Sequence, residues 1–287
     1  MTARVLPHSV DVAWLAAELA RKPSDLVLVD VRWKLGAPGA GAAAYAAGHL
    51  PGAFFADVDR DLAAPPSPAL GRHPLPSAKA FQAFAEAAGI GDATRVVAYD
   101  DQGGATAARL WFLLRYFGHD TGAVLDGGVQ AWVAAGHPLS KAASTPARAT
   151  FYAVAHPELL ASADETAALA RDPAALVVDA RAPERYRGEV EPIDARPGHI
   201  PGTRSLPFAG NLADGRLLAV DALKARLVAA GLADKPTVAY CGSGVTACHD
   251  LWAAAVAGVP VPRLYAGSWS QWAADANRPV SSGAEPG

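Results

Sequence analysis

The residue best suited to chemistry is Cys241, which lies between an apolar run and a helical pattern. Val238 to Tyr240 predicts a buried strand, and a glycine-containing turn after the cysteine leads into an apolar helix near residues 247–256. Cys241 therefore stands at a helix N-terminus, where the N–H groups of residues 242–246 and the helix dipole favour a thiolate, which is a nucleophile. The alternative, a small buried cysteine without a chemical role, does not explain the glycines of this turn.

Composition limits the class of protein. The 287 residues are 51% hydrophobic and 18% charged, with a formal net charge of −3, and this length permits one large domain or two ordinary ones. No apolar run is long enough for a membrane span, the start lacks a signal-peptide pattern, and no basic block suggests nucleic acid. The two cysteines form neither a disulfide framework nor a metal-ligand spacing. We expect a soluble, cytoplasmic protein with no membrane, nucleic-acid or metal partner.

The sequence contains two copies of one domain pattern. An apolar run ending in Asp-x-Arg occurs at 26–32 and returns at 176–181, and a Gly-His-[Leu/Ile]-Pro-Gly turn occurs at 48–52 and returns at 198–202. Short apolar strands alternate with helices, which predicts an α/β fold with two tandem domains, each a mainly parallel sheet flanked by helices. The expected limits are a first domain over 1–140, a linker over 141–150 and a second domain over 151–287.

Capping residues predict several helix ends. Ser9 and Ser162 each precede a helical pattern, and Glu165 completes a capping box with Ser162. Two further helices are expected to run from an N-cap residue to a terminating glycine, over 77–89 and 221–231.

Residues present in both copies are interpreted as structural, and the two histidines are expected to bond nearby backbone within their turns. These pairs are Asp30 and Asp179, Arg32 and Arg181, His49 and His199, Trp111 and Trp252, and Trp132 and Trp272.

The copies differ at the cysteine. The first copy has Asp100 at the position of Cys241, and a carboxylate cannot carry transferable sulfur. Only the second copy is therefore equipped for thiolate chemistry, and the first is interpreted as a scaffold. The histidine turn and the tyrosine ending the next strand are 50 residues apart in the first copy and 41 in the second. The nine extra residues fall within 57–76, a proline-rich stretch that predicts an irregular excursion.

With this loop, the duplication and the repeated histidine turn, nearly the whole chain resembles the tandem-domain rhodanese family of sulfurtransferases. The loop Cys241-Gly-Ser-Gly-Val-Thr246 resembles its 3-mercaptopyruvate sulfurtransferase branch, whereas members that prefer thiosulfate carry basic side chains where this chain has Gly242 and Ser243. Thiosulfate is a dianion that gains from cationic loop residues, while mercaptopyruvate has one carboxylate that an arginine fork can grip.

The resemblance also implies residues that bind the donor carboxylate. The family's Arg-[Phe/Tyr]-Arg-Gly motif is present at 185–188, and its binding arginine matches Arg185. A second family arginine follows this motif, but the segment is shorter here, and Arg196 is the nearby candidate, with Arg187 as the other possibility. The alternative is that Arg185 and Arg187 are a solvated loop pair.

A proposed Ser-His-Asp set in the mercaptopyruvate branch maps by position onto Ser243, His73 and Asp59. The last two lie in or beside the extra segment of the first copy, which suggests that this segment reaches the loop of the second copy. The alternative is a surface histidine in a proline-rich loop.

The resemblance implies a two-step covalent mechanism without a metal or organic cofactor. Cys241 takes sulfur from the donor as a persulfide, stabilised by the N–H groups of Gly242, Ser243, Gly244, Val245 and Thr246, and passes it to a thiol, thioredoxin or cyanide. Alternatives are a thiosulfate sulfurtransferase and a non-catalytic persulfide carrier or binding module. A cysteine phosphatase is disfavoured because its Cys-x5-Arg pattern would need arginine where this chain has Ala247. The role of Cys248 stays open.

Overall fold

The computed structural model describes residues 6–287, which form two compact units. The N-terminal unit comprises the chain up to residue 63 together with 76–156, and the C-terminal unit comprises 64–75 and 157–287. Residues 1–5, at the start of the predicted first domain, lie outside the described residues. Part of the proline-rich excursion, residues 64–75, thus belongs to the C-terminal unit.

In the described part of the N-terminal unit, five parallel strands form one sheet in the order β1-β5-β4-β2-β3. The strands are β1 (Ser9–Val10), β2 (Leu26–Asp30), β3 (Phe54–Phe55), β4 (Arg95–Tyr99) and β5 (Gly122–Leu125). The helices are α1 (Val12–Ala20), α2 (Ala40–Ala47), α3 (Ala78–Ala87), α4 (Ala107–Tyr116) and α5 (Gly128–Ala134).

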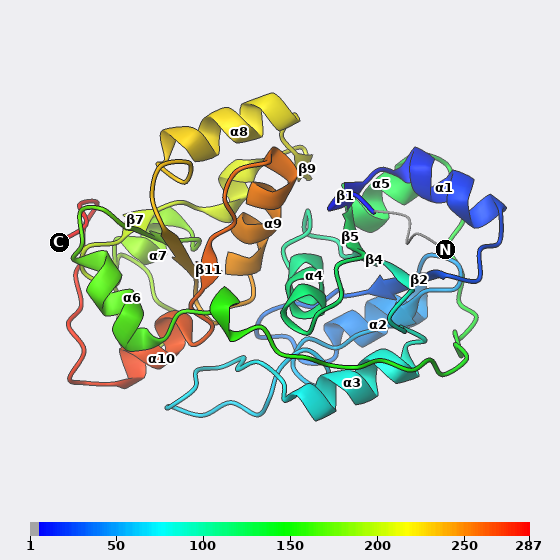
Figure 1. Cartoon of the computed structure of the whole chain (residues 1–287), viewed down its shortest axis with the longest axis horizontal. Helices are drawn as coiled ribbons and strands as arrows, with labels where there is room; N and C mark the ends of the chain where they lie inside the picture. The colour runs from blue at the N-terminus through cyan, green and yellow to red at the C-terminus, as the bar shows by residue number, and fades with distance from the viewer. Residues whose placement is uncertain (1–5) are drawn as a thin grey trace. The chain divides into compact units, whose positions relative to one another are not determined.

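Alternation along these strands separates two packed faces. Leu28, Val97 and Ala123 are aligned across β2, β4 and β5, and they share a core with residues of α1 and α5. Because successive side chains of a strand point to opposite faces, Val29 and Ala98 face the other side, where α3 and α4 lie (Figure 1). Both faces are covered, as expected for a parallel sheet.

The C-terminal unit repeats this plan on four parallel strands, within the described residues, in the order β11-β10-β6-β7. They are β6 (Leu176–Asp179), β7 (Arg204–Ser205), β10 (Thr237–Tyr240) and β11 (Arg263–Leu264), and β8 (Leu212–Ala213) and β9 (Arg216–Leu217) form a small antiparallel pair. The helices are α6 (Ala163–Ala170), α7 (Pro183–Tyr186), α8 (Val220–Ala229), α9 (Ala247–Ala257) and α10 (Ser268–Ala274), with 3-10 turns η1 (Pro157–Leu159) and η2 (Phe208–Asn211).

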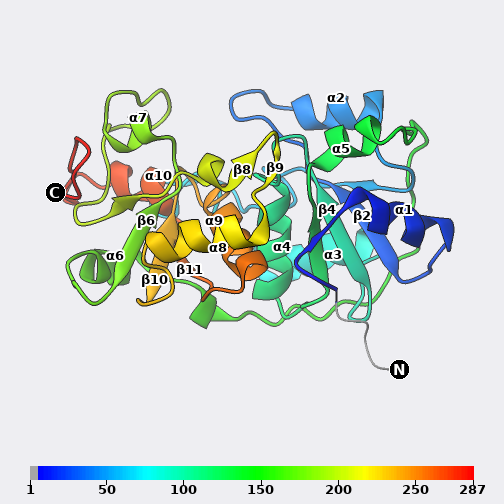
Figure 2. The ribbon, with the colours of Figure 1, turned by 90° about the horizontal axis from the view of Figure 1, so that it is seen from above.

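The sheet of the C-terminal unit is also covered on two sides. Val177 and Val238 share a core with residues of α6 and α10, while α9 packs on β10, β11 and α8 (Figure 2). The predicted fold of two tandem α/β domains with parallel sheets is confirmed. No helix of residues 6–287 is both long and apolar enough to cross a lipid bilayer.

The helix ends follow the capping prediction in part. Ser162 and Glu165 form the predicted capping box, and the Ser77 side chain accepts from the third residue of α3. The prediction was wrong at Ser9, which pairs in β1, so that Asp11 caps α1 instead. It was also wrong at Asp221, the second residue of α8, where a carboxylate still favours the positive helix end without capping it.

The duplicated acid and arginine residues hold equivalent turns. In the N-terminal unit, Arg32 Nη2 donates to Asp30 at 2.6 Å and to the carbonyl of Gly48 at 2.7 Å. In the C-terminal unit, Arg181 Nη2 makes the same two bonds, to Asp179 at 2.6 Å and to Gly198 at 2.7 Å. Each arginine therefore ties the end of a strand to its histidine turn.

The duplicated histidines are structural in the same way. His49 Nδ1 lies 2.9 Å from the carbonyl oxygen of Tyr45, and the two rings stack at 3.9 Å. His199 Nδ1 lies 2.8 Å from the carbonyl oxygen of Tyr186, with the rings at 3.8 Å. Both imidazoles bond nearby backbone, as expected from their presence in both copies.

Candidate active site

The cysteine loop, residues 241–246, joins β10 to α9, as the sequence predicts. Cys241 follows the last residue of β10 directly, and α9 begins at Ala247. The Cys241 side chain is buried, and its Sγ accepts a hydrogen bond from the backbone N–H of Gly244 at 3.2 Å. The loop thus presents a backbone donor, the N–H of Gly244, to the sulfur.

The start of α10 holds the outer side of the cysteine loop. The carbonyl groups of Cys241 and Gly242 accept from the N–H groups of Trp269 and Ser270, each at 2.9 Å. The N–H of Cys241 donates to Ser268 Oγ at 3.1 Å. These three bonds fix the backbone of Cys241 and Gly242 against α10, while the N–H of Gly244 is the group that bonds the sulfur.

Gly244 is needed for this loop geometry. Its φ is +75°, and a Cβ built on it would lie 2.5 Å from the carbonyl oxygen of Ala266. A side chain here would meet backbone that has no freedom to move. The glycine therefore permits the turn that directs its N–H at Cys241.

The matching loop of the N-terminal unit contains an anion of its own, Asp100. This carboxylate is fully buried. Its oxygens accept at 2.8–2.9 Å from the backbone N–H groups of Gln102, Gly104, Thr106 and Ala107. A loop of this design therefore binds negative charge through its N–H groups.

Ser243 and His73 lie together in the C-terminal unit. Ser243 Oγ and His73 Nδ1 are 2.7 Å apart, and both side chains are buried. This contact joins the cysteine loop to segment 64–75. Asp59 belongs to the N-terminal unit, where its Oδ2 accepts from Trp33 Nε1 at 2.9 Å, and its pairing with His73 stays a prediction.

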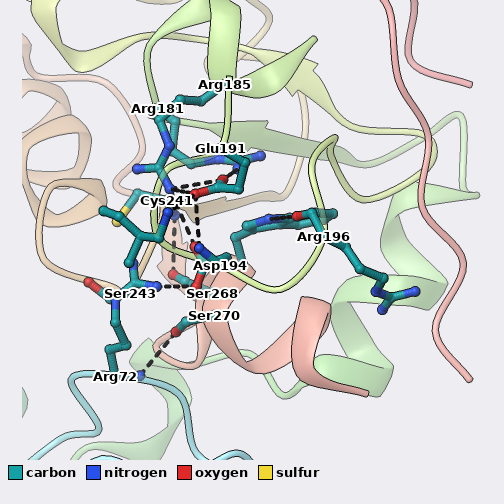
Figure 3. A network of polar contacts seen from close by, with 12 residues as sticks. Arg72, Arg181, Arg185, Glu191, Asp194, Arg196, Cys241, Ser243, Ser268 and Ser270 are labelled. Atoms are coloured by element: carbon teal, nitrogen blue, oxygen red, sulfur yellow. Dashed lines mark hydrogen bonds and ion pairs between the residues drawn. The ribbon is translucent and has the colours of Figure 1, made fainter. Parts of the chain in front are cut away.

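Two guanidinium groups flank the residue after the cysteine. A Cβ built on Gly242 would lie 3.0 Å from Arg72 Nη2 and 3.3 Å from Arg185 Nη1. The Nε atoms of Arg72 and Arg185 are buried without a hydrogen-bond partner among the described residues. Each of these arginines therefore has a terminal nitrogen near Gly242 and a separate buried Nε without a partner, and the two come from different segments (Figure 3).

Two buried carboxylates contact these arginines from another side. Arg185 Nη2 donates to Glu191 at 2.7 Å and contacts Asp194 at 3.3 Å, and Arg72 Nη1 bonds the other oxygen of Asp194 (Figure 3). Burial raises the pKa of the Asp194 carboxyl, while the charge of Arg72 acts in the opposite direction. A cavity of about 310 Å³ borders Arg72, Asp194 and Ser270.

The other predicted arginines are engaged elsewhere. Arg196 donates to four backbone carbonyls between Trp272 and Arg278, so its guanidinium is occupied in holding the segment after α10. Arg187 pairs at 2.7 Å with the exposed Glu189. Next to Gly242, the structure places Arg72 together with Arg185, and a donor-binding role of Arg196 or Arg187 stays a prediction.

The arrangement has the elements of sulfur chemistry: a buried thiol in an N–H cradle, two cations beside it, and a serine bonded to a histidine. Residues 11–135 and 162–275 each match the rhodanese-like domain. The chain belongs to the rhodanese family. The match covers both units of the chain, including the N-terminal unit that has Asp100 in place of the cysteine.

Similar proteins match nearly the whole chain. A protein of Pseudomonas aeruginosa named "Probable 3-mercaptopyruvate sulfurtransferase" is 46% identical over 275 residues, covering 94% of this chain and 96% of its own. A thiosulfate sulfurtransferase of Bos taurus is 35% identical, covering 92% and 91%. The structure of SseA from Escherichia coli, described among 3-mercaptopyruvate sulfotransferases, has a TM-score of 0.80 at 32% identity, covering 92% and 99%.

Arg72 was missed by the sequence prediction. It precedes His73 directly in the irregular excursion, and its side chain reaches Asp194, which lies 122 residues further along the chain. The available signal was its adjacency to a histidine that already had a proposed role. Asp194 and Glu191 were missed as well, because acidic residues are not expected to line a site for anions.

Proposed function

We propose that this protein is a sulfurtransferase that takes sulfur from 3-mercaptopyruvate and carries it as a persulfide on Cys241. The observation that carries the proposal is that Arg72 Nη2 and Arg185 Nη1 both lie near Gly242, the residue that follows Cys241. Two guanidinium groups with unused donors suit a carboxylate, which accepts two parallel hydrogen bonds. Relatives named for this activity support the proposal.

In the first step, the Cys241 thiolate attacks the thiol sulfur of mercaptopyruvate. A sulfur–sulfur bond forms, the carbon–sulfur bond breaks, and the electron pair leaves with the carbon as the enolate of pyruvate. The N–H groups of the cysteine loop stabilise charge on the persulfide, in the way that the matching loop binds Asp100.

Ser243 and His73 are proposed to serve the leaving group. The enolate needs one proton to become pyruvate, and a serine hydroxyl bonded to an imidazole at 2.7 Å is able to deliver it and be reprotonated. Asp59 is proposed to orient His73. Sulfite, the leaving group from thiosulfate, needs no such proton, so this arrangement favours mercaptopyruvate.

In the second step, an acceptor thiolate attacks the outer sulfur and releases the Cys241 thiolate. Small-molecule sulfur donors and acceptors follow from the family. A thiol, thioredoxin or cyanide is proposed as the acceptor, and the cytoplasm as the location.

A thiosulfate sulfurtransferase is the second candidate, because relatives of that name match over most of the chain. The deciding experiment measures kcat/KM for mercaptopyruvate and thiosulfate side by side, with cyanide as a common acceptor. We expect mercaptopyruvate to be the better donor. A higher value for thiosulfate would favour the second candidate, and no sulfur transfer from either donor would contradict the function itself.

Arg185→Lys tests how the donor is bound. The substitution keeps the positive charge and removes the planar fork, so the KM for mercaptopyruvate should rise by about 10-fold or more, and that for thiosulfate by less. Arg187→Lys, at the neighbouring exposed arginine, is the control and should change neither value. Equal changes for both donors with Arg185→Lys would show that Arg185 does not recognise a carboxylate.

A further inference from the structure

The donor site of the C-terminal unit contains a row of alternating charges. Asp179 pairs with Arg181, Arg181 with Glu191, Glu191 with Arg185, Arg185 with Asp194, and Asp194 with Arg72. The side chains of Glu191 and Asp194 are only 2% and 5% exposed. Three arginines are thus matched by three carboxylates, and the two guanidinium groups at Gly242 carry little net charge together with their partners.

Asp194 bonds one of the two terminal nitrogens of Arg72 and one of those of Arg185. It bonds Nη1 of Arg72 and Nη2 of Arg185. The opposite terminal nitrogens, Nη2 of Arg72 and Nη1 of Arg185, are those nearest Gly242. One carboxylate therefore bridges both guanidinium groups on one side and turns their other nitrogens toward the cysteine loop.

We propose that Asp194 is a positioning residue that selects monoanionic sulfur donors over dianionic ones. This inference rests on the proposed sulfurtransferase function and extends it to the charge of the donor. Asp194 aligns Arg72 and Arg185 for a single carboxylate, and its own negative charge repels an anion at Gly242. Mercaptopyruvate carries one negative charge on its carboxylate, whereas thiosulfate carries two, so the same repulsion acts about twice as strongly on thiosulfate.

The negative charge of Asp194 is what makes this site differ from an ordinary basic site. A basic site beside a thiolate would ordinarily bind a dianion more tightly than a monoanion. Here the two guanidinium groups keep their hydrogen-bonding geometry while Glu191 and Asp194 offset their charge. Recognition then depends on the shape of the acceptor oxygens rather than on total charge.

The test is Asp194→Asn, which preserves size and removes the charge. The ratio of kcat/KM for thiosulfate to kcat/KM for mercaptopyruvate should rise on the order of tenfold, as expected for one unit charge at an effective dielectric constant of about 20, reduced by salt. Glu189→Gln removes an exposed carboxylate of the same segment and should leave the ratio unchanged. A merely structural role of Asp194 would lower both kcat/KM values together and leave the ratio where it was, which would overturn the proposal.

A second measurement uses the unaltered protein and does not require turnover. Pyruvate and sulfate, one a monoanion and one a dianion, are compared for protection of Cys241 against iodoacetamide at constant ionic strength, with mass spectrometry locating the label. Pyruvate should protect at lower concentration than sulfate. Stronger protection by sulfate would overturn the proposal even if Asp194→Asn fails to fold. If the unaltered protein transfers sulfur from neither donor, the proposed function fails, while this measurement still decides the anion preference.

Discussion

Gly244 donates a hydrogen bond to one cysteine of the chain and accepts one from the other. Its N–H donates to Cys241 Sγ at 3.2 Å, whereas its carbonyl accepts from the thiol of Cys248 at 3.3 Å. The first contact stabilises negative charge on sulfur, and the second requires that Cys248 keep its proton. At the residue scale, the backbone N–H and carbonyl of Gly244 therefore favour Cys241 over Cys248 as the nucleophile.

This difference predicts the outcome of two substitutions. Cys241→Ser should abolish sulfur transfer, because serine is a poor sulfur acceptor, while Cys248→Ser should retain most of the activity, because a hydroxyl also donates to the carbonyl of Gly244. Mass spectrometry of the intact protein after donor treatment should find one added sulfur, located on Cys241 by peptide mapping. Sulfur found on Cys248 would overturn the assignment.

The Ser243 and His73 contact predicts a loss that depends on the donor. His73→Ala should slow persulfide formation from mercaptopyruvate on the order of 10²-fold and affect thiosulfate less, because only the enolate must be protonated. Ser243→Ala should have a similar effect, and the double variant should be little worse than either. Independent, multiplying losses would show that the two side chains do not act on the same step.

The sequence predicts a site residue from its neighbours only where those neighbours form a recognisable pattern of strand, turn and helix. Cys241 was identified from a strand, a glycine turn and a helix that follow one another in the sequence, whereas Ser243 was predicted from the family resemblance. Arg72 was not predicted, because the expected second arginine was sought close to the Arg185 motif, and the donor-binding role of Arg196 stays a prediction. The guanidinium that reaches Gly242 comes from a segment without regular structure, and periodicity carries no signal there.

At the scale of elements, the position of the cysteine loop depends on the first residue of α10. Ser268 has φ of +53°, a conformation that costs a residue with a side chain about 1 kcal/mol, and its Oγ accepts the N–H of Cys241. The matching position of the N-terminal unit is Gly128, also with φ of +53°. The C-terminal unit thus maintains a strained serine where the N-terminal unit has a glycine.

Substitution of Ser268 separates the strain from the hydrogen bond. Ser268→Ala keeps the strain and leaves the buried N–H of Cys241 without its acceptor, so unfolding free energy should fall by about 1–3 kcal/mol and kcat should fall with it. Ser268→Gly loses the same bond but relieves the strain, and it should be more stable than the alanine variant by about 1 kcal/mol. Thermal unfolding and donor kinetics check both, and a glycine variant less stable than the alanine variant would refute the argument.

Elements with strong periodicity or complete capping signals were predicted well. β10 and α9 follow the apolar pattern around Cys241, and the capping box of α6 lies where Ser162 and Glu165 indicated. The start of α8 was placed at Asp221 because aspartate is a good N-cap, yet α8 begins at Val220. Single capping residues are ambiguous to within a residue or two, since an acidic side chain also favours the first turn.

At the scale of the whole molecule, the duplication allows each residue of one copy to be compared with the matching residue of the other. Residues shared by both copies, such as Asp30 and Asp179 or His49 and His199, make equivalent structural contacts. Residues found in one copy, such as Cys241 and Asp100, separate the two roles. The N-terminal unit is informative because the hydrogen bonds to Asp100 show which N–H groups the matching loop directs at an anion.

The contacts of Asp100 predict that this carboxylate stabilises the N-terminal unit, and that a cysteine in its place would not restore sulfur transfer. Asp100→Ala leaves several buried N–H groups without an acceptor and should lower the free energy of unfolding on the order of 3 kcal/mol, whereas Asp101→Ala, at an exposed residue, should have little effect.

Asp100→Cys, made in a Cys241→Ser background, should acquire no sulfur from mercaptopyruvate, because Asp101 places a carboxylate at the position that matches Gly242. Sulfur on the new cysteine would contradict the scaffold interpretation.

The assignment of residues 64–75 to the C-terminal unit has a consequence during synthesis. Ser243 emerges from the ribosome 170 residues after His73, so at about 5–20 residues per second the segment waits on the order of 10–30 s for its partner. A hydrophobic strand exposed for that time would be prone to aggregate. The prolines of this stretch, which include Pro65, Pro66, Pro68 and Pro74, remove backbone donors and disfavour strand pairing, so the segment that contains His73 has little tendency to aggregate before Ser243 is made.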